Sequence, residues 1–95
     1  MKREEALRLL DEFVKSESLR KHLLSVEAAM RAYARHLGED EERWGVAGLL
    51  HDFDWEACPR PEDHPFYAAD LLRQRGAPEW LVRAVLSHGD HTGTP

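Results

Sequence analysis

His51 and Asp52 form the pair of adjacent residues in this sequence best suited to chemistry. They follow the apolar run AGLL at positions 47–50, so they stand at the inner end of a helix. A carboxylate and an imidazole placed there are costly to bury unless they are paired or bind a metal. Neutral imidazoles and carboxylates are ligands for Zn, Fe, Mn, Ni or Co, and carboxylates also suit Mg. The pair therefore predicts a divalent metal ion as cofactor.

Three histidines fall on the apolar stripes of three different predicted helices. His51 follows Trp44 by seven positions, His22 follows Leu19 by three, and His88 continues the apolar face of the last helix. A single inward histidine is most often a hydrogen-bonded core residue. Three of them on separate helices, with an aspartate and a fourth histidine close by in sequence, favour one shared ligand.

Helical periodicity predicts an all-α fold, a compact bundle of about five helices without a sheet. The predicted helices cover residues 3–15, 19–37, about 39–51, 64–75 and 78 onward, with a loop over 54–63. Gly38 and Gly76 suit helix ends, and Pro65 and Pro78 suit first turns. The second helix is predicted to bury a stripe formed by Leu19, His22, Val26, Ala29 or Met30, Tyr33 and Leu37.

Composition predicts one domain over residues 1–95 and excludes several classes of protein. The net charge is −5 and the basic residues are scattered, so no nucleic-acid partner is expected. Cys58 is the single cysteine, which excludes a disulfide within the chain and a thiolate zinc cluster. No apolar run approaches a membrane span, and the acidic amphipathic start does not resemble a secretory signal. A cytoplasmic protein without membrane contact is expected.

An open metal site is a better expectation than a closed structural zinc site, because no thiolate ligands are available. A divalent ion lowers the pKa of a bound water from about 15.7 to about 7. It also neutralises negative charge that develops on a phosphoryl oxygen. Both effects serve the hydrolysis of phosphate esters.

The order of these motifs resembles the HD superfamily of metal-dependent phosphohydrolases, in particular its small bacterial predicted hydrolases. The resemblance rests on His22, on "LLHDFD", on "EDHP" and on "LSHGDHTGTP", and it spans about residues 19–95. It implies an all-α fold and a small phosphomonoester, nucleotide or phosphodiester as substrate.

The resemblance also implies roles for individual residues. His22, His51 and Asp52 correspond to metal ligands, and Asp52 would bridge the ions if two were bound. His64 and His88 correspond to further histidines that bind a second metal or contact substrate in some members. Asp52, His64 and His88 are accordingly expected to be catalytic.

Other polar and aromatic residues receive weaker assignments. Arg20 and Lys21 flank His22 and are candidates for binding a substrate phosphate. Asp54 is a candidate for orienting a ligand histidine, although capping or solvation in the loop is an equal alternative. The tryptophans at 44, 55 and 80 are expected in the core or in a pocket wall.

The family's last metal ligand, an aspartate on a later helix, has no clear counterpart before Pro95. Asp90 follows His88 too closely, so the expectation is a fragment, a short member, or a protein completed by a partner subunit. Exposed apolar surface would then favour a homo-oligomer, most simply a symmetric dimer. Two alternatives to an enzyme stay open: a metal- or nucleotide-binding regulatory module, and a helical interaction domain whose inward histidines are core residues.

Overall fold

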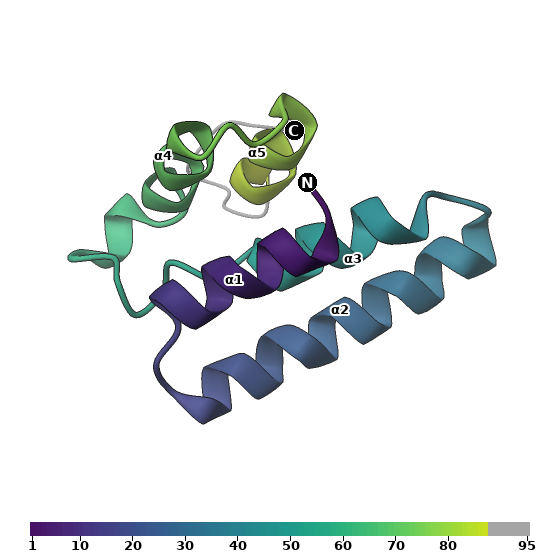
Figure 1. Ribbon diagram of the computed structural model, residues 1–95, viewed down its shortest axis with the longest axis horizontal. Coiled ribbons are helices and arrows are strands. Elements are labelled where there is room, and N and C mark those ends of the chain that lie inside the picture. Colours follow the sequence, from purple (N-terminus) through teal and green to yellow (C-terminus); the bar gives the residue numbers. More distant parts are fainter. Residues whose placement is uncertain (88–95) are drawn as a thin grey trace.

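The computed structural model describes residues 1–87, and the fold in this part is all-α (Figure 1). Its elements in chain order are α1 (Arg3–Phe13), α2 (Glu17–Leu37), α3 (Glu41–Leu50), the 3₁₀ turn η1 (Pro61–Asp63), α4 (Phe66–Gln74) and α5 (Glu79–Ser87). The described part of the chain contains five α-helices and no strand, as the periodicity predicts.

The central element is α3, which contacts α1, α2 and α5. Figure 1 shows α1 and α3 lying along the long helix α2, with α4 and α5 together beyond them. Burial of α3 on several sides explains its composition, because its buried residues are the apolar or small Gly45, Val46, Gly48, Leu49 and Leu50. His51 and Asp52, which follow the last residue of α3, are therefore positioned by the central helix of the bundle.

Gly48 permits the close approach of α2 and α3. A Cβ at this position would lie 3.1 Å from Cγ of Met30 and 3.2 Å from the carbonyl oxygen of Val26. The second of these neighbours is backbone and cannot move aside cheaply. A residue without a side chain is needed here for packing, although glycine is a poor helix former.

Side-chain caps account for the boundaries of α2 and α3. The Ser16 hydroxyl accepts a hydrogen bond from the Leu19 N–H, so α2 begins at Glu17, two residues before the predicted start. Gly38 ends α2 in the left-handed conformation with φ 72°, as predicted. The Asp40 carboxylate accepts from the Arg43 N–H at the start of α3.

The buried face of α2 differs from the predicted stripe. Its buried residues are Leu23, Glu27 and Ala34, whereas Tyr33 is 63% exposed and Leu37 is 58% exposed. The prediction was anchored on His22 and was therefore rotated by about one position. The true stripe escaped notice because it contains a glutamate.

Glu27 is buried because two arginines neutralise it. One carboxylate oxygen accepts from Nε of Arg3 at 2.6 Å and from Nε of Arg31 at 3.0 Å. Burial raises the pKa of the Glu27 carboxyl, but the hydrogen bonds from both arginines lower it by more, so its pKa lies below the ordinary value. These contacts fasten the start of α1 to the middle of α2.

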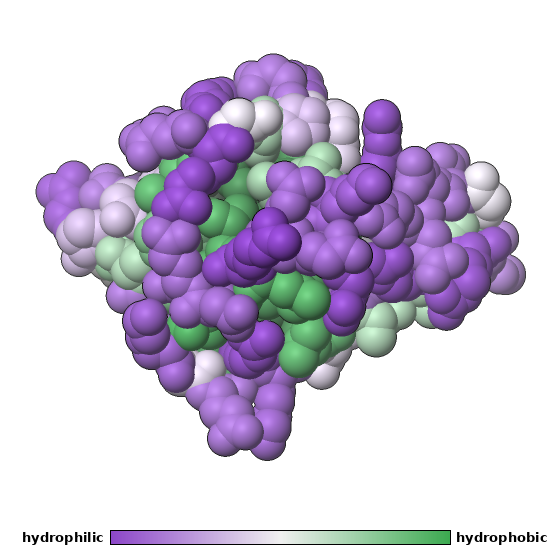
Figure 2. Space-filling model, in the orientation of Figure 1, coloured by the Kyte–Doolittle hydropathy of each residue, from purple (hydrophilic) through white to green (hydrophobic). Residues whose placement is uncertain are grey.

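Hydrophilic side chains cover most of the face shown in Figure 2, and apolar atoms are visible between them. Within residues 1–87, no helix combines the length and the apolar character needed to cross a membrane.

Candidate metal centre

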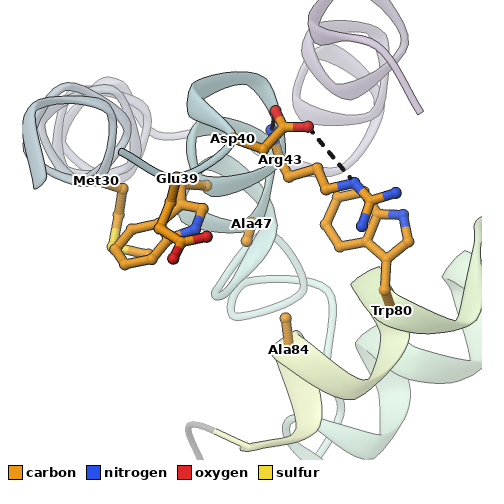
Figure 3. Close-up of a pocket in the computed structure, with 8 residues that line it drawn as sticks. Met30, Glu39, Asp40, Arg43, Ala47, Trp80 and Ala84 are labelled. Atoms are coloured by element: carbon orange, nitrogen blue, oxygen red, sulfur yellow. Dashed lines mark hydrogen bonds and ion pairs between the residues drawn. The ribbon is translucent and has the colours of Figure 1, made fainter. Parts of the chain in front are cut away.

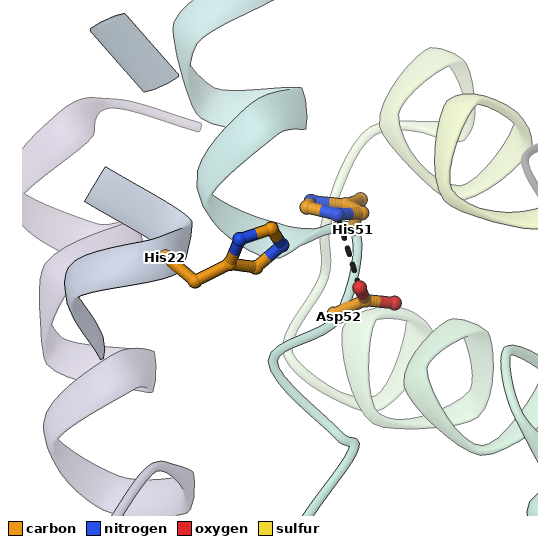
Figure 4. A group of neighbouring side chains, drawn as sticks. All are labelled: His22, His51 and Asp52. Carbon is orange, nitrogen blue, oxygen red and sulfur yellow. Dashed lines mark ion pairs between the residues drawn. The ribbon is translucent and has the colours of Figure 1, made fainter. Parts of the chain in front are cut away.

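Side chains from two helices converge at the inner end of α3. His22 comes from the second turn of α2, His51 caps the C-terminus of α3, and Asp52 opens the turn that follows. One ligand atom from each of the three residues lies within 4.8 Å of the other two (Figure 4). The His22 and His51 rings are 5.9 Å apart between centroids.

The contacts of His51 are compatible with a cation at this place. Nδ1 lies 2.7 Å from the Gly48 carbonyl oxygen, which can only accept, so Nδ1 carries the proton in the neutral ring. Nε2 then directs a lone pair toward Oδ2 of Asp52, 3.1 Å away. Two electron-rich atoms at this distance require a proton or a metal ion between or beside them.

The pKa of His51 is raised by the same contacts. Burial lowers the pKa of the ring, but the contacts with Asp52 and Gly48 raise it by more, so the net pKa lies above the ordinary value. A divalent ion would satisfy the same atoms in place of a proton. The donor set thus fits a divalent metal.

His64 approaches Asp52 from the other side. Its Nε2 lies 2.9 Å from Oδ1 of Asp52, while the second oxygen of that carboxylate faces His51. The side chain of His64 is 11% exposed, and its ring packs edge-on against Trp55 with centroids 5.4 Å apart. Asp52 therefore lies between two imidazoles, although His64 is not one of the three mutually close ligands.

Asp54 is fully buried behind His64 and fixes its ring. Oδ1 lies 2.6 Å from Nδ1 of His64, and Oδ2 accepts from the Ala68 N–H at 3.1 Å. Burial raises the pKa of the Asp54 carboxyl above its ordinary value, and the His64 ring and the Ala68 N–H offset this only in part. The contact with His64 places Asp54 where an orienting residue would stand. The bond from the Ala68 N–H shows that Asp54 also caps the first turn of α4, so only solvation in the loop is ruled out.

The predicted inward orientation of the histidines needs correction. His22 is exposed and His51 is half-buried, so they lie near the surface at the end of α3 instead of in the core. Trp44, Ala47 and His51 share one face of α3, as predicted, but this face is only partly buried. The other faces of the helix are more deeply buried. His88 lies outside the described residues.

The residues proposed to bind a substrate phosphate are not gathered at this centre. Arg20 pairs with Asp11 of α1 at 2.7 Å, and Lys21 is exposed. Because residues two apart on a helix point to nearly opposite sides, Arg20 does not share the face of His22. A phosphate-binding role for Arg20 and Lys21 stays a prediction.

A family model described as HD domain matches residues 19–95, most of the chain. The chain belongs to the HD domain family. HD domains bind divalent metals, and most members of the family are metal-dependent phosphohydrolases. Searches of the curated proteins and of the solved structures found no significant match.

The sequence did not predict two contacts made by the residues that follow Asp54 in this HD domain, and Trp55, expected in the core or in a pocket wall, is 56% exposed. Trp55 packs against His64, and Glu56 accepts hydrogen bonds from the Lys15 and Ser16 N–H groups. Both lie in the segment that reads as an irregular loop, where no periodicity indicates which side chain turns inward. These contacts are therefore visible only in the folded chain.

Proposed function

We propose that this HD domain is a metal-dependent phosphohydrolase that acts on a small phosphomonoester, nucleotide or phosphodiester. The observation that carries the proposal is the meeting of ligand atoms from His22, His51 and Asp52 within 4.8 Å. Two imidazoles and one carboxylate leave coordination positions for water and substrate, as catalytic sites require. Membership of a family that consists mostly of metal-dependent phosphohydrolases supports the same class of reaction.

The proposed roles follow from the contacts of each side chain. His22, His51 and Asp52 would hold the ion, with His51 fixed by the Gly48 carbonyl. A bound divalent ion supplies Lewis acidity that activates water and offsets charge on the phosphoryl group. Negative charge from Asp52 balances that ion and also faces His64.

His64 is proposed as the catalytic acid or base. Asp54 holds the ring through Nδ1, and Nε2, which lies 2.9 Å from Oδ1 of Asp52, is proposed as the nitrogen that exchanges a proton with the substrate. Asp54 touches neither ion nor substrate in this account and is a positioning residue. His88, the other predicted catalytic histidine, keeps that role as a prediction.

The test compares His22→Ala with His36→Ala. His36 is an exposed histidine in the last turn of the same helix, so it is a matched control. Metal content is measured by mass spectrometry after purification without added metal. Hydrolysis of p-nitrophenyl phosphate and bis-p-nitrophenyl phosphate is measured with Mn²⁺ or Ni²⁺ added.

The parent and His36→Ala are expected to retain metal and to hydrolyse at least one ester, and His22→Ala is expected to lose both properties. Metal retention without turnover of either ester would contradict the hydrolase and support a binding module. Equal metal content in all three proteins would contradict the assignment of His22.

A further inference from the structure

An aromatic pocket lies between α2, α3 and α5, with a volume of about 360 Å³. This volume falls within the range of about 300–1,000 Å³ that is typical of small-molecule sites. Figure 3 shows side chains from the three helices pointing into it. Its apolar wall consists of Met30, Trp44, Ala47, Trp80 and Ala84.

The pocket and the candidate metal centre are neighbours along α3, because Ala47 of the pocket wall lies one helical turn before His51. Ala47 and His51 are four residues apart on the same edge of α3, about 6 Å along the helix axis. Met30 and His22 are eight residues apart on α2, about 12 Å, and also share one side of that helix.

The charged residues at the rim exclude a second phosphate from this pocket. They are Glu39, Asp40 and Arg43, with one more negative than positive charge. Nε of Arg43 lies 3.7 Å from Oδ2 of Asp40, and its guanidinium covers one face of Trp80 at 4.9 Å. Arg43, the one cation among the lining residues that the structure describes, is therefore already engaged, and the surroundings favour an uncharged ligand with a flat apolar body.

We propose that this pocket binds the neutral aromatic group of a phosphoester whose phosphate lies at His22, His51 and Asp52. The proposal rests on the proposed function for the phosphate end alone. Two indoles and a methionine offer a large, polarisable contact to an aromatic ring. The pocket determines substrate selectivity, whereas the reaction takes place at the metal centre.

The first arm of the test needs neither metal nor turnover. The indole N–H signals of the protein are followed by ¹H–¹⁵N NMR during titration with 1-naphthalenemethanol, after assignment through single Trp→Phe variants. Trp44 and Trp80 are in the pocket wall, and Trp55 borders a separate hollow with Ser16, Ser18 and Leu19. The signals of Trp44 and Trp80 are expected to shift with saturation, and the signal of Trp55 is not.

The second arm fills the pocket with Ala84→Leu and uses Ala32→Leu as the matched control. Ala84 lines the pocket on α5, and Ala32 is an exposed residue of α2. Selectivity is the ratio of kcat/KM for 1-naphthyl phosphate to that for glycerol 2-phosphate. Ala84→Leu is expected to lower this ratio at least tenfold, mainly through KM of the naphthyl ester, and to abolish the NMR shifts. Ala32→Leu is expected to keep the parent's ratio and shifts.

A shift confined to Trp55, no saturable shift, or equal selectivity in the two variants would overturn the proposal. A second outcome is that neither ester reacts, while the indole shifts occur in the parent and are absent in Ala84→Leu. This outcome would contradict the hydrolase and leave the pocket supported. The two proposals therefore fail in different ways.

Discussion

At the scale of single residues, the buried carboxylate of Asp54 orients His64 in the candidate centre. Asp54 uses both of its oxygens, one for His64 and one for the Ala68 N–H. Neither contact involves the surface of the molecule. The orientation of His64 relative to Asp52 therefore depends on a residue that would not touch substrate.

Asp54→Asn tests this arrangement. An amide keeps one accepting oxygen for the Ala68 N–H, but its nitrogen can only donate, so contact with Nδ1 of His64 is kept only if the ring gives up its proton at that nitrogen. The free energy of unfolding in urea is expected to fall by about 1–3 kcal/mol. Asp70→Asn, at an exposed position of α4, is the control and is expected to change it by less than about 0.5 kcal/mol. Equal stability of the two variants would contradict the structural role of Asp54.

The grouping of His22, His51 and Asp52 could be anticipated from the family's motif order, although the apolar stripe on which His22 was placed is not the buried face of α2. The contact between His64 and Asp54 could only be offered as one of two alternatives. His64 follows a loop of ten residues, and spacing along an irregular segment does not fix where a side chain points. The packing of Trp55 on His64 was beyond prediction for the same reason.

At the scale of elements, the pairing of α2 with α3 decides where the ligands meet. His22 lies on one of these helices and His51 on the other, so the distance between the helices sets the distance between the rings. Gly48 sets that separation, because a Cβ there would contact the backbone of α2.

Gly48→Ala is expected to destabilise the protein, although alanine favours a helix by about 1 kcal/mol over glycine. Overpacking costs about 1–3 kcal/mol, and the backbone of Val26 cannot yield. A net loss of 1 kcal/mol corresponds to a fall in Tm of about 4–8 °C in a domain of this size. Calorimetry measures it. A rise in Tm would show that the helices have room to separate at this point.

The ion pairs of Glu27 predict an acid sensitivity. Because the pKa of Glu27 is lowered on folding, its ionised form stabilises the protein above the unfolded pKa, about 4.3, and this contribution disappears as the pH falls through the folded-state pKa. Between pH 6 and pH 3, Glu27→Gln is expected to lose less stability than the parent. At pH 6 to 7 the variant is expected to be less stable by about 1.5–3 kcal/mol.

The control for this prediction is Glu17→Gln, an exposed first-turn position of the same helix. Chemical denaturation across the pH range should give it the profile of the parent. A profile of Glu27→Gln that parallels the parent would show that the pairs with Arg3 and Arg31 do not lower the pKa of this carboxyl.

The five helices and most of their ends were predictable because apolar periodicity, glycine at helix ends and first-turn prolines agree with one another. The buried face of α2 was not. Glu27 occupies a core position because Arg3 of α1 and Arg31 of α2 both donate to it. A prediction based on apolar periodicity assigns a glutamate to the exposed face. Tyr33 and Leu37 were assigned inward on the same pattern and are exposed.

For the whole molecule, self-association stays a prediction. Tyr33 and Leu37 leave apolar surface exposed near the C-terminal end of α2. Sedimentation velocity is expected to show a dimer at high protein concentration. A single monomeric species at every concentration would contradict it.

The most direct test of the central claim measures how much a metal ion stabilises the folded protein with and without the charge of Asp52. A ligand that binds only the native state at 100 times its Kd stabilises it by about 2.7 kcal/mol. For a domain of this size that amounts to a rise in Tm of about 10 °C or more. Asp52→Asn preserves the shape of the side chain but removes the negative charge that balances the cation, and Asp70→Asn is the matched control. Calorimetry of metal-free protein with added Zn²⁺ or Mn²⁺ should show the full rise in the parent and in Asp70→Asn, and less than a third of it in Asp52→Asn. An equal rise in all three proteins would contradict the account, because the ion would then be held somewhere other than at His22, His51 and Asp52.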